Sequence, residues 1–194
     1  MNSSLSRFLS HYLLTPMLQD SLSETSHSAA VLVPIINHPQ GPTLLFTRRS
    51  RQLRHHPGQV AFPGGKRDQA DHSLYQTALR ETYEEVGIAS QFIEKVGELP
   101  TVNSRTGHCV KPFLALVQPG FRLNLNRDEV AEVFEVPLLH LVEPNHYISL
   151  PFGPRQVHFL PYGSHLIWGM TANILLHLTS KAAPLWPCAP HDKY

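Results

Sequence analysis

The stretch Arg80-Glu81-Thr82-Tyr83-Glu84-Glu85-Val86-Gly87-Ile88 decides how the rest of this chain is interpreted. On an α-helix, with about 100° between successive residues, Glu81, Glu84 and Glu85 crowd one face. Like charges at this spacing destabilise a helix, and Arg80 can pair with Glu84 but cannot serve all three carboxylates. A hard divalent cation such as Mg²⁺ prefers oxygen ligands of this kind. A solvated acidic face is the commoner explanation, so the helix alone does not establish a metal site.

The residues around this acidic stretch predict a helix with defined ends. Ser73 and Gln76 fit the capping-box pattern at its start, and Gly87 can adopt the left-handed conformation that closes its far end. One face carries the side chains that we expect to pack on a sheet: Tyr75, Leu79, Thr82 and Val86.

The chain before the acidic helix is typical of a hairpin followed by a functional loop. Residues 31–36 and 44–48 are β-rich runs separated by a turn-like cluster, so we expect them to pair. Residues 50–72 form a long connection of the kind often found at functional sites. It contains Pro63-Gly64-Gly65, where glycine lets the backbone approach a phosphate or a metal ion. A Walker-type phosphate loop is excluded because its motif does not occur.

The other apolar runs predict a mixed α/β sandwich. Residues 96–99, 110–117 and 130–136 are expected to form strands or short helical pieces, and residues 166–178 a closing helix. A short amphipathic helix is predicted near the start, where five apolar residues recur at helical spacing: Leu5, Phe8, Leu9, Tyr12 and Leu13.

Length and composition fit one domain with appendages and no special scaffold. For the 194 residues we expect an N-terminal helical extension and linker (1–28), one domain (29–180) and a C-terminal tail (181–194). The net charge of +1 provides no global field to recruit nucleic acid or an anionic membrane. The two cysteines, Cys109 and Cys188, lie far apart, which argues against a disulfide scaffold or a zinc ribbon. With no signal peptide or long apolar run, we expect a cytoplasmic protein.

Residues 65–88 resemble the Nudix box, in which a glycine and an acidic residue precede Arg-Glu-x-x-Glu-Glu-x-Gly and an aliphatic residue. The second half of the box is matched completely. The resemblance implies the Nudix fold, a mixed β-sheet sandwiched between α-helices, and hydrolysis that depends on Mg²⁺ or Mn²⁺. It also implies that Glu81, Glu85 and Gly65 bind the metal, and that Glu84 is a further ligand, a base or an orienting residue.

The first half of the box departs from the pattern. The box has a glutamate six residues after its glycine and an arginine eight residues later. Counted from Gly65, the sixth residue is Asp71, and Arg80 lies nine residues beyond it. The loop is therefore one residue longer than the pattern, with Asp71 or Asp68 in the place of the glutamate.

Residues 44–65 closely resemble the signature of the coenzyme A pyrophosphatase branch of Nudix enzymes, including Gly58-Gln-Val-Ala-Phe-Pro-Gly-Gly65. Residues 100–107 and 168–172 also look like that branch. The resemblance implies cleavage of the diphosphate of coenzyme A or its thioesters to 3′,5′-ADP and a 4′-phosphopantetheine species. The alternatives are another Nudix specificity, such as ADP-ribose or NADH, and a catalytically silent Nudix-fold binding module.

Positive charge is concentrated just before the box in a chain that is nearly neutral overall. Arginine makes bidentate, permanently charged contacts with phosphate, so we expect this segment to bind the substrate. A basic loop that only keeps the protein soluble, or that binds RNA, is the alternative, and RNA is disfavoured because interleaved aromatic residues are missing. The predicted substrate-binding residues are Arg48, Arg49, Arg51, Arg54 and His56.

A second acidic segment, Asp128-Glu129-Val130-Ala131-Glu132, follows later in the chain. Many Nudix enzymes carry a late acidic residue near the metal, and the resemblance implies that Glu129 or Glu132 supplies it; the start of a surface helix is the other interpretation. We assign the catalytic roles to Glu84 and Glu129. The expected partner is a small-molecule substrate, without nucleic acid or membrane, and a homodimer is left open.

Overall fold

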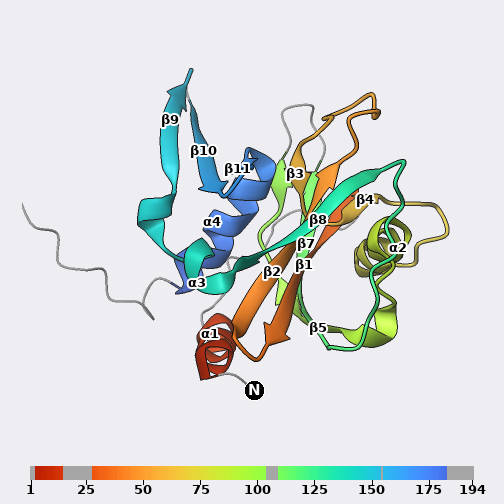
Figure 1. The fold of residues 1–194 in the computed structure, drawn as a ribbon, viewed down its shortest axis with the longest axis horizontal. Helices are drawn as coiled ribbons and strands as arrows, with labels where there is room; N and C mark the ends of the chain where they lie inside the picture. The colour runs from red at the N-terminus through yellow and green to blue at the C-terminus, as the bar shows by residue number, and fades with distance from the viewer. Residues whose placement is uncertain (1–2, 15–27, 104–108, 154, 183–194) are drawn as a thin grey trace, which may run out of the picture.

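The computed structural model describes residues 3–14, 28–103, 109–153 and 155–182. Its largest element is a mixed sheet in which five strands follow the order β3-β2-β1-β7-β5, while β4 pairs with β1, β6 with β7 and β8 with β2 (Figure 1). Strands β1 and β7 are parallel and the other pairs are antiparallel. The strands of this sheet are β1 (Ala29–His38), β2 (Gly41–Arg49), β3 (Val60–Ala61), β4 (Gly64–Lys66), β5 (Ile93–Glu98), β6 (Val102–Asn103), β7 (Cys109–Val117) and β8 (Val130–Pro137).

Helices cover both faces of this sheet (Figure 1). On one face α2 (Leu74–Val86) packs on β1 and β4, where Leu74 and Ala78 meet Ala30 and Leu32. On the other face α1 (Ser3–Leu14) and α4 (Met170–Ala182) lie against each other and contact the sheet. The mixed sheet sandwiched between helices is confirmed.

A second, three-stranded antiparallel sheet extends from the α4 side (Figure 1). It contains β9 (Ile148–Phe152), β10 (Arg155–Tyr162) and β11 (His165–Trp168), and it follows the short helices α3 (Leu138–Leu141) and η3 (Pro144–His146). Between α2 and β5 lies a further short helix, η2 (Ser90–Phe92).

Several predicted elements are confirmed and some bounds are wrong. Residues 31–36 and 44–48 pair as the β1–β2 hairpin. The predicted closing helix 166–178 begins too early, because residues up to Trp168 pair with β10, and Gly169, with φ of 63°, lets the chain turn into α4. The long connection 50–72 is also less irregular than expected, since it contains β3 and β4.

The N-terminal helix forms and joins the main core. Leu5, Phe8 and Tyr12 are buried there, and the Tyr12 hydroxyl donates to the carbonyl of Glu98 at 2.7 Å. Leu13, predicted on the same apolar face, is instead 65% exposed because it lies one residue beyond the buried stripe. None of the described helices has the length and apolar character needed to cross a bilayer.

Candidate active site

Helix α2 begins and ends where its sequence predicts. The Ser73 hydroxyl accepts the N–H of Gln76 at 3.1 Å, and Gly87 takes a left-handed φ of 80° while its N–H donates to the Tyr83 carbonyl. A Cβ at Gly87 would lie 2.8 Å from Asn124, so the close approach of the following loop also requires glycine. Of the predicted packing face, Thr82 and Val86 are buried, while Tyr75 and Leu79 lie half-buried at its margin.

The capped helix holds the Glu81 side chain directly against β4. An added Cβ at Gly65 would lie 2.5 Å from the Glu81 Cδ atom, a distance that no real side chain tolerates. Glycine at this position therefore lets a carboxylate and a backbone strand come together, which is the arrangement that a shared metal ion needs.

Glu85 is the most deeply buried acid of the helix. It is 4% exposed, and one of its oxygens accepts the N–H of Gly64 at 3.2 Å. Burial raises the pKa of Glu85 to about 8; the Gly64 hydrogen bond and the charge of Arg49 oppose this shift, whereas Glu81 adds to it. Burial also raises the pKa of Glu81, against the effect of Arg80. Both carboxylates are thus held where negative charge is poorly compensated.

Glu129 lies close enough to act on this pair, although it is about 45 residues away in the chain. Its negative charge contributes to the raised pKa of both Glu81 and Glu85. Its carbonyl accepts the Ser50 N–H at 2.7 Å, which ties the segment before β8 to the end of β2. The two segments predicted to carry functional residues therefore meet at the carboxylates.

The other late acid, Glu132, lies elsewhere. Arg48 reaches it through Nε at 2.8 Å and Nη2 at 2.7 Å, and the His165 ring lies 3.1 Å away. Desolvation raises the pKa of Glu132, but hydrogen bonds from His165 and Arg48 and the charge of Arg48 outweigh it and hold this pKa below its usual value. Glu132 thus has two partners of its own within the chain, whereas Glu129 approaches the acidic helix.

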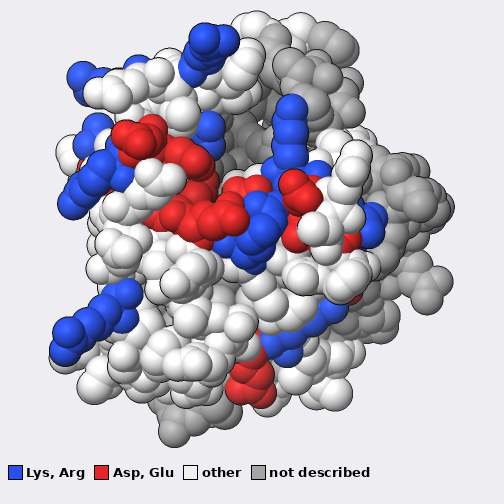
Figure 2. Space-filling model, turned by 90° about the vertical axis from the view of Figure 1, so that its right-hand side faces the viewer, with Lys and Arg blue, Asp and Glu red and all other residues white. Residues whose placement is uncertain are grey.

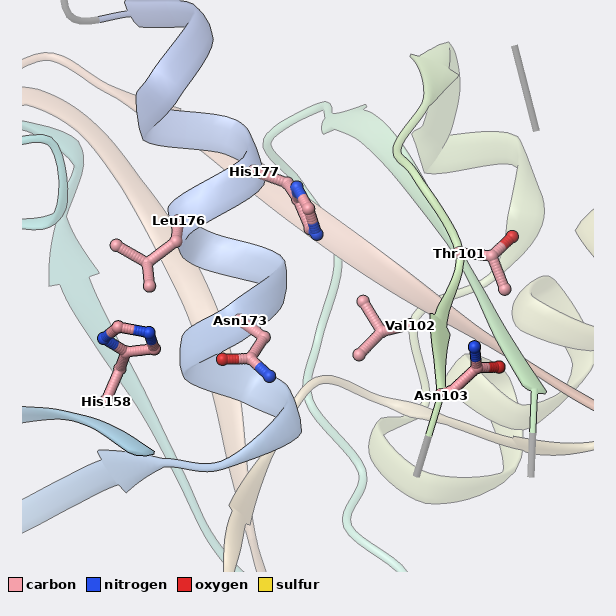
Figure 3. Close-up of a pocket in the computed structure, with 7 residues that line it drawn as sticks. All are labelled: Thr101, Val102, Asn103, His158, Asn173, Leu176 and His177. Carbon is pink, nitrogen blue, oxygen red and sulfur yellow. The ribbon is translucent and has the colours of Figure 1, made fainter. Parts of the chain in front are cut away.

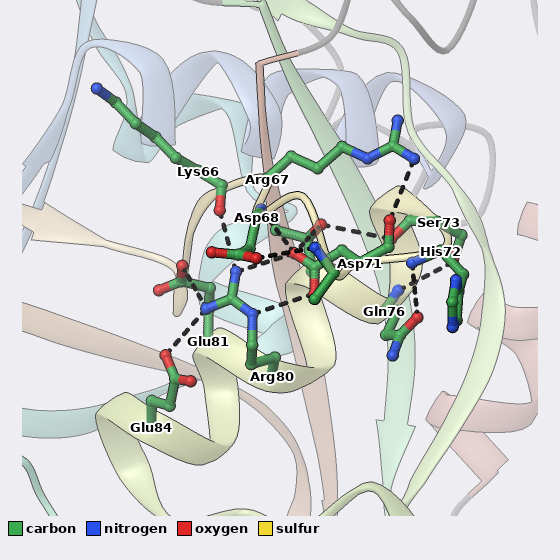
Figure 4. Close-up of polar contacts among 12 residues, drawn as sticks. Lys66, Arg67, Asp68, Asp71, His72, Ser73, Gln76, Arg80, Glu81 and Glu84 are labelled. Carbon is green, nitrogen blue, oxygen red and sulfur yellow. Dashed lines mark hydrogen bonds and ion pairs between the residues drawn. The ribbon is translucent and has the colours of Figure 1, made fainter.

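Asp71 and Arg80 form a latch between the loop and α2, which Figure 4 shows. Asp71 is 5% exposed and accepts hydrogen bonds from the Thr77 hydroxyl at 2.9 Å, the Asp68 N–H at 2.9 Å, and Arg80 Nε and Nη2 at 3.1 and 3.0 Å. The Arg80 hydrogen bonds lower the pKa of Asp71 to about 2, against the effect of burial. Of the two aspartates in the lengthened box, Asp71 is the one that binds the arginine.

Arg80 also contacts the outer acids of α2. Its Nη1 lies 3.0 Å from both Glu81 and Glu84, and its Nη2 donates to the Lys66 carbonyl at 3.0 Å. Glu84 is half-exposed, with 51% of its side chain accessible, so it stands apart from the buried pair. Figure 2 shows acidic side chains gathered on this side of the molecule with basic side chains among them.

The predicted substrate-binding residues are divided by the pleat of β2. Arg48 turns to the side of β11 and pairs with Glu132, while Arg49 acts on Glu85 on the α2 side. Successive residues of a strand point to opposite faces, and the pairing of β2 with β8 also shifts register between these two arginines. The Arg49 Nε is buried without a hydrogen-bond partner among the described residues.

The remaining predicted substrate-binding residues lie on the exposed loop between β2 and β3. Arg51, Arg54 and His56 are all exposed, and His56 has a positive φ of 53°. Backbone hydrogen bonds from Gly58 to Arg49 and from Arg49 to Gln59 close the base of this loop. The loop thus presents cations to solvent from a hairpin whose base reaches the carboxylate site.

The donors fit a hard divalent cation rather than a softer metal. Glu81, Glu85, Glu129 and the Gly65 backbone supply oxygen atoms, the kind that Mg²⁺ and Mn²⁺ prefer. Among the described residues no three acidic, histidine or cysteine side chains are already arranged as a complete ligand set. The close packing of Glu81 on Gly65 and the uncompensated charge of Glu85 nevertheless match the needs of such an ion.

Comparisons with known proteins agree with the family that the sequence motif on α2 indicates. The NUDIX domain family model matches residues 26–156. A protein named as an uncharacterized Nudix hydrolase, NudL, from Photorhabdus laumondii is 45% identical over 183 residues, covering 92% of this chain and 97% of that protein. Its namesake from Yersinia enterocolitica is 42% identical over 182 residues, covering 92% and 93%.

Solved structures share the fold at low sequence identity. The Nudix hydrolase RenU from M. smegmatis is 19% identical with a TM-score of 0.56, covering 84% of this chain and 90% of that one. The NUDIX domain of Shewanella oneidensis NrtR, solved in complex with ADP ribose, is 20% identical with a TM-score of 0.50, covering 95% and 99%. From the family model, these relatives and the box on α2, we conclude that the chain belongs to the Nudix hydrolase family and acts on pyrophosphate substrates.

Proposed function

We propose that this Nudix hydrolase cleaves the diphosphate of coenzyme A or its thioesters, releasing 3′,5′-ADP and 4′-phosphopantetheine or its acyl derivative. The observation that carries the proposal is the cationic hairpin loop with Arg51, Arg54 and His56, which is rooted beside the carboxylates. Coenzyme A carries a 3′-phosphate in addition to its diphosphate, so its recognition calls for a second anion site of this kind.

The chain's own residues divide the work of hydrolysis in this proposal. Glu81, Glu85 and the Gly65 carbonyl would hold Mg²⁺ or Mn²⁺, which supplies charge neutralisation for the diphosphate. Glu129 accepts the proton of the attacking water, because it approaches the buried pair from a separate segment. As the water oxygen bonds to phosphorus, the bond from phosphorus to the bridging oxygen breaks and the leaving phosphate keeps the electron pair.

Arg49 is the predicted substrate-binding residue that acts on the buried carboxylates. Its charge acts on Glu85, and its Nε is buried without a partner in the described chain. A buried guanidinium donor without a partner is costly, and a phosphate oxygen would satisfy it. We therefore assign Arg49 to the diphosphate and the exposed loop cations to the 3′-phosphate. Arg48, which is held by Glu132, is left outside the proposed binding set.

The test compares coenzyme A with dephospho-coenzyme A. A charge-assisted contact contributes about 1.5–3 kcal/mol, so loss of the 3′-phosphate should lower kcat/KM roughly ten- to a hundredfold. Arg51→Ala or Arg54→Ala should remove most of this difference and leave turnover of dephospho-coenzyme A nearly unchanged. Arg122→Ala, which removes the same charge at another exposed position, is the matched control and should keep the full difference.

The alternative substrates give a different result. If wild type hydrolyses the two coenzyme A forms equally, and mass spectrometry shows faster cleavage of ADP-ribose or NADH, the coenzyme A assignment is wrong. The enzyme would then be a Nudix pyrophosphatase of broader nucleotide specificity.

A further inference from the structure

An open pocket of about 340 Å³ lies between α4 and β6, separate from the carboxylates. In Figure 3, Val102 points from β6 across the gap towards α4, where Asn173, Leu176 and His177 follow one another along the helix. His158 approaches from β10.

The pocket is connected to the catalytic edge by one row of the sheet. The pairing registers place Val102 beside Val110, Val110 beside Ala29, and Ala29 beside Lys66. Three strand spacings separate the ends of this row, a distance of about 14 Å. Lys66 directly follows Gly65, against which Glu81 packs.

The alternation of side chains shows which face this row occupies. Ala30, one residue after Ala29, packs with Leu74 on the α2 side. Residues paired across a sheet share a face and successive residues alternate, so Ala29 and Lys66 belong to the opposite face, the one that α4 covers. Val102 confirms this because it packs in the core cluster that contains Leu175 of α4. The pocket and the Lys66 side chain therefore lie on the same face of the sheet, with Val110 and the small Ala29 between them.

The pocket lining suits an uncharged planar group. Its walls combine apolar Val102 and Leu176 with the amide of Asn173, and no lysine, arginine, aspartate or glutamate of the described ranges lines it. Among the described residues the Asn173 side chain has no hydrogen bond. An asparagine amide offers a donor beside an acceptor, which matches the N6 and N7 edge of adenine, and histidine rings such as His158 can stack on a base.

We propose that this pocket binds the adenine base of the substrate, with Asn173 reading the base edge and the diphosphate lying at Lys66 and Gly65. The inference rests on the proposed function only in taking the substrate to be an adenine nucleotide. A rigid base loses little conformational freedom in so open a pocket, whereas a flexible pantetheine arm would lose much more. The base is therefore the favoured occupant.

The experiment measures binding without turnover, using 5′-AMP, 5′-IMP and 4′-phosphopantetheine titrated into the full-length protein by NMR. In IMP an oxo group replaces the 6-amino group, so the edge no longer matches the amide. AMP should bind roughly tenfold more tightly than IMP, as a bidentate contact predicts. Asn173→Leu should weaken AMP to the level of IMP, and Asn173→Asp, which keeps the side-chain shape, should do the same.

Ser180→Ala is the control on the same helix, because within the part of the chain that the structure describes this exposed hydroxyl bonds only to the His177 carbonyl and lies outside the pocket lining. It should retain the full preference for AMP. Equal binding of AMP and IMP by wild type, or a loss confined to 4′-phosphopantetheine in the Asn173 variants, would overturn the proposal. Failure of coenzyme A hydrolysis with the AMP preference intact would instead refute the proposed function and leave the base site standing.

Discussion

Asp71 and Glu85 are both buried carboxylates at α2, and their surroundings shift their pKa values in opposite directions. Asp71 accepts hydrogen bonds from a hydroxyl, a backbone N–H and a guanidinium, and its pKa is lowered to about 2. Glu85 accepts one backbone N–H, and burial raises its pKa to about 8. Asp71 has its cation, Arg80, within the chain. Glu85 has no cation in the described residues that fully compensates its charge.

The contrast separates a structural acid from an acid reserved for a ligand. A fully satisfied buried ion pair fixes geometry, and here the Asp71–Arg80 pair anchors the loop that carries Gly65. An undercompensated buried carboxylate costs stability and is retained where function demands it. We therefore expect substitutions in the two places to separate stability from turnover.

Metal removal should have the largest effect. Chelation by EDTA should abolish hydrolysis, and Mg²⁺ or Mn²⁺ should restore it, because Glu81 and Glu85 then lose and regain the cation that binds the diphosphate. The fold should remain, since the Asp71–Arg80 latch contains no metal ligand. Circular dichroism alongside the activity assay checks both points. Tightly held stoichiometric zinc in the purified protein would contradict the oxygen-ligand assignment.

Replacing the buried acids of α2 should have the second-largest effect on activity. Glu81→Gln and Glu85→Gln should each lower kcat at least about a hundredfold, because they remove charge that holds the metal. Without metal the Tm of Glu85→Gln should equal or exceed that of wild type, since glutamine does not carry the folding cost that the raised pKa of Glu85 imposes near neutral pH. Glu84→Gln is the matched comparison on the same helix.

The sequence led us to assign Glu84 a catalytic role, but it is half-exposed and pairs with Arg80, so we now expect its replacement to lower kcat less than tenfold. Measurement of kcat for Glu84→Gln and Glu85→Gln at saturating Mg²⁺ tests this prediction. If Glu84→Gln proved as damaging as Glu85→Gln, the division between buried and exposed acids of α2 would be wrong.

The latch should show the smallest effect on chemistry and the clearest effect on stability. Asp71→Asn should lower the free energy of unfolding at pH 7 by about 2 kcal/mol, because a shift of nearly two pKa units is lost. Asp71 is ionised more readily in the folded protein, so its contribution is complete above pH 4 and disappears as the pH falls towards 2. Denaturant unfolding at several pH values measures this.

The difference between wild type and Asp71→Asn should therefore shrink on acidification. Thr77→Val removes one of the donors to Asp71 and should reproduce part of the loss with the carboxylate in place. A deficit that stayed constant down to pH 2 would show that Asp71 acts through packing rather than through its charge.

The sequence alone determined the features that depend on local spacing. The caps at Ser73 and Gly87, the acidic face of α2 and the β1–β2 hairpin follow from residues within a few positions of one another. The box indicated the Nudix family, and the family model and relatives bear that out, while the coenzyme A branch indicated by residues 44–65 stays a prediction. The division into segments 1–28, 29–180 and 181–194 stays a prediction, although α1 packs in the common core.

Only the tertiary structure decided which partners these residues meet. The pleat and register shift of β2 separate Arg48, paired with Glu132, from Arg49, which acts on Glu85. The approach of Glu129 to the site and the pocket at Asn173 likewise depend on strand order. Composition and helical periodicity report neighbours along the chain, whereas these contacts depend on the register between distant strands, which local spacing does not encode.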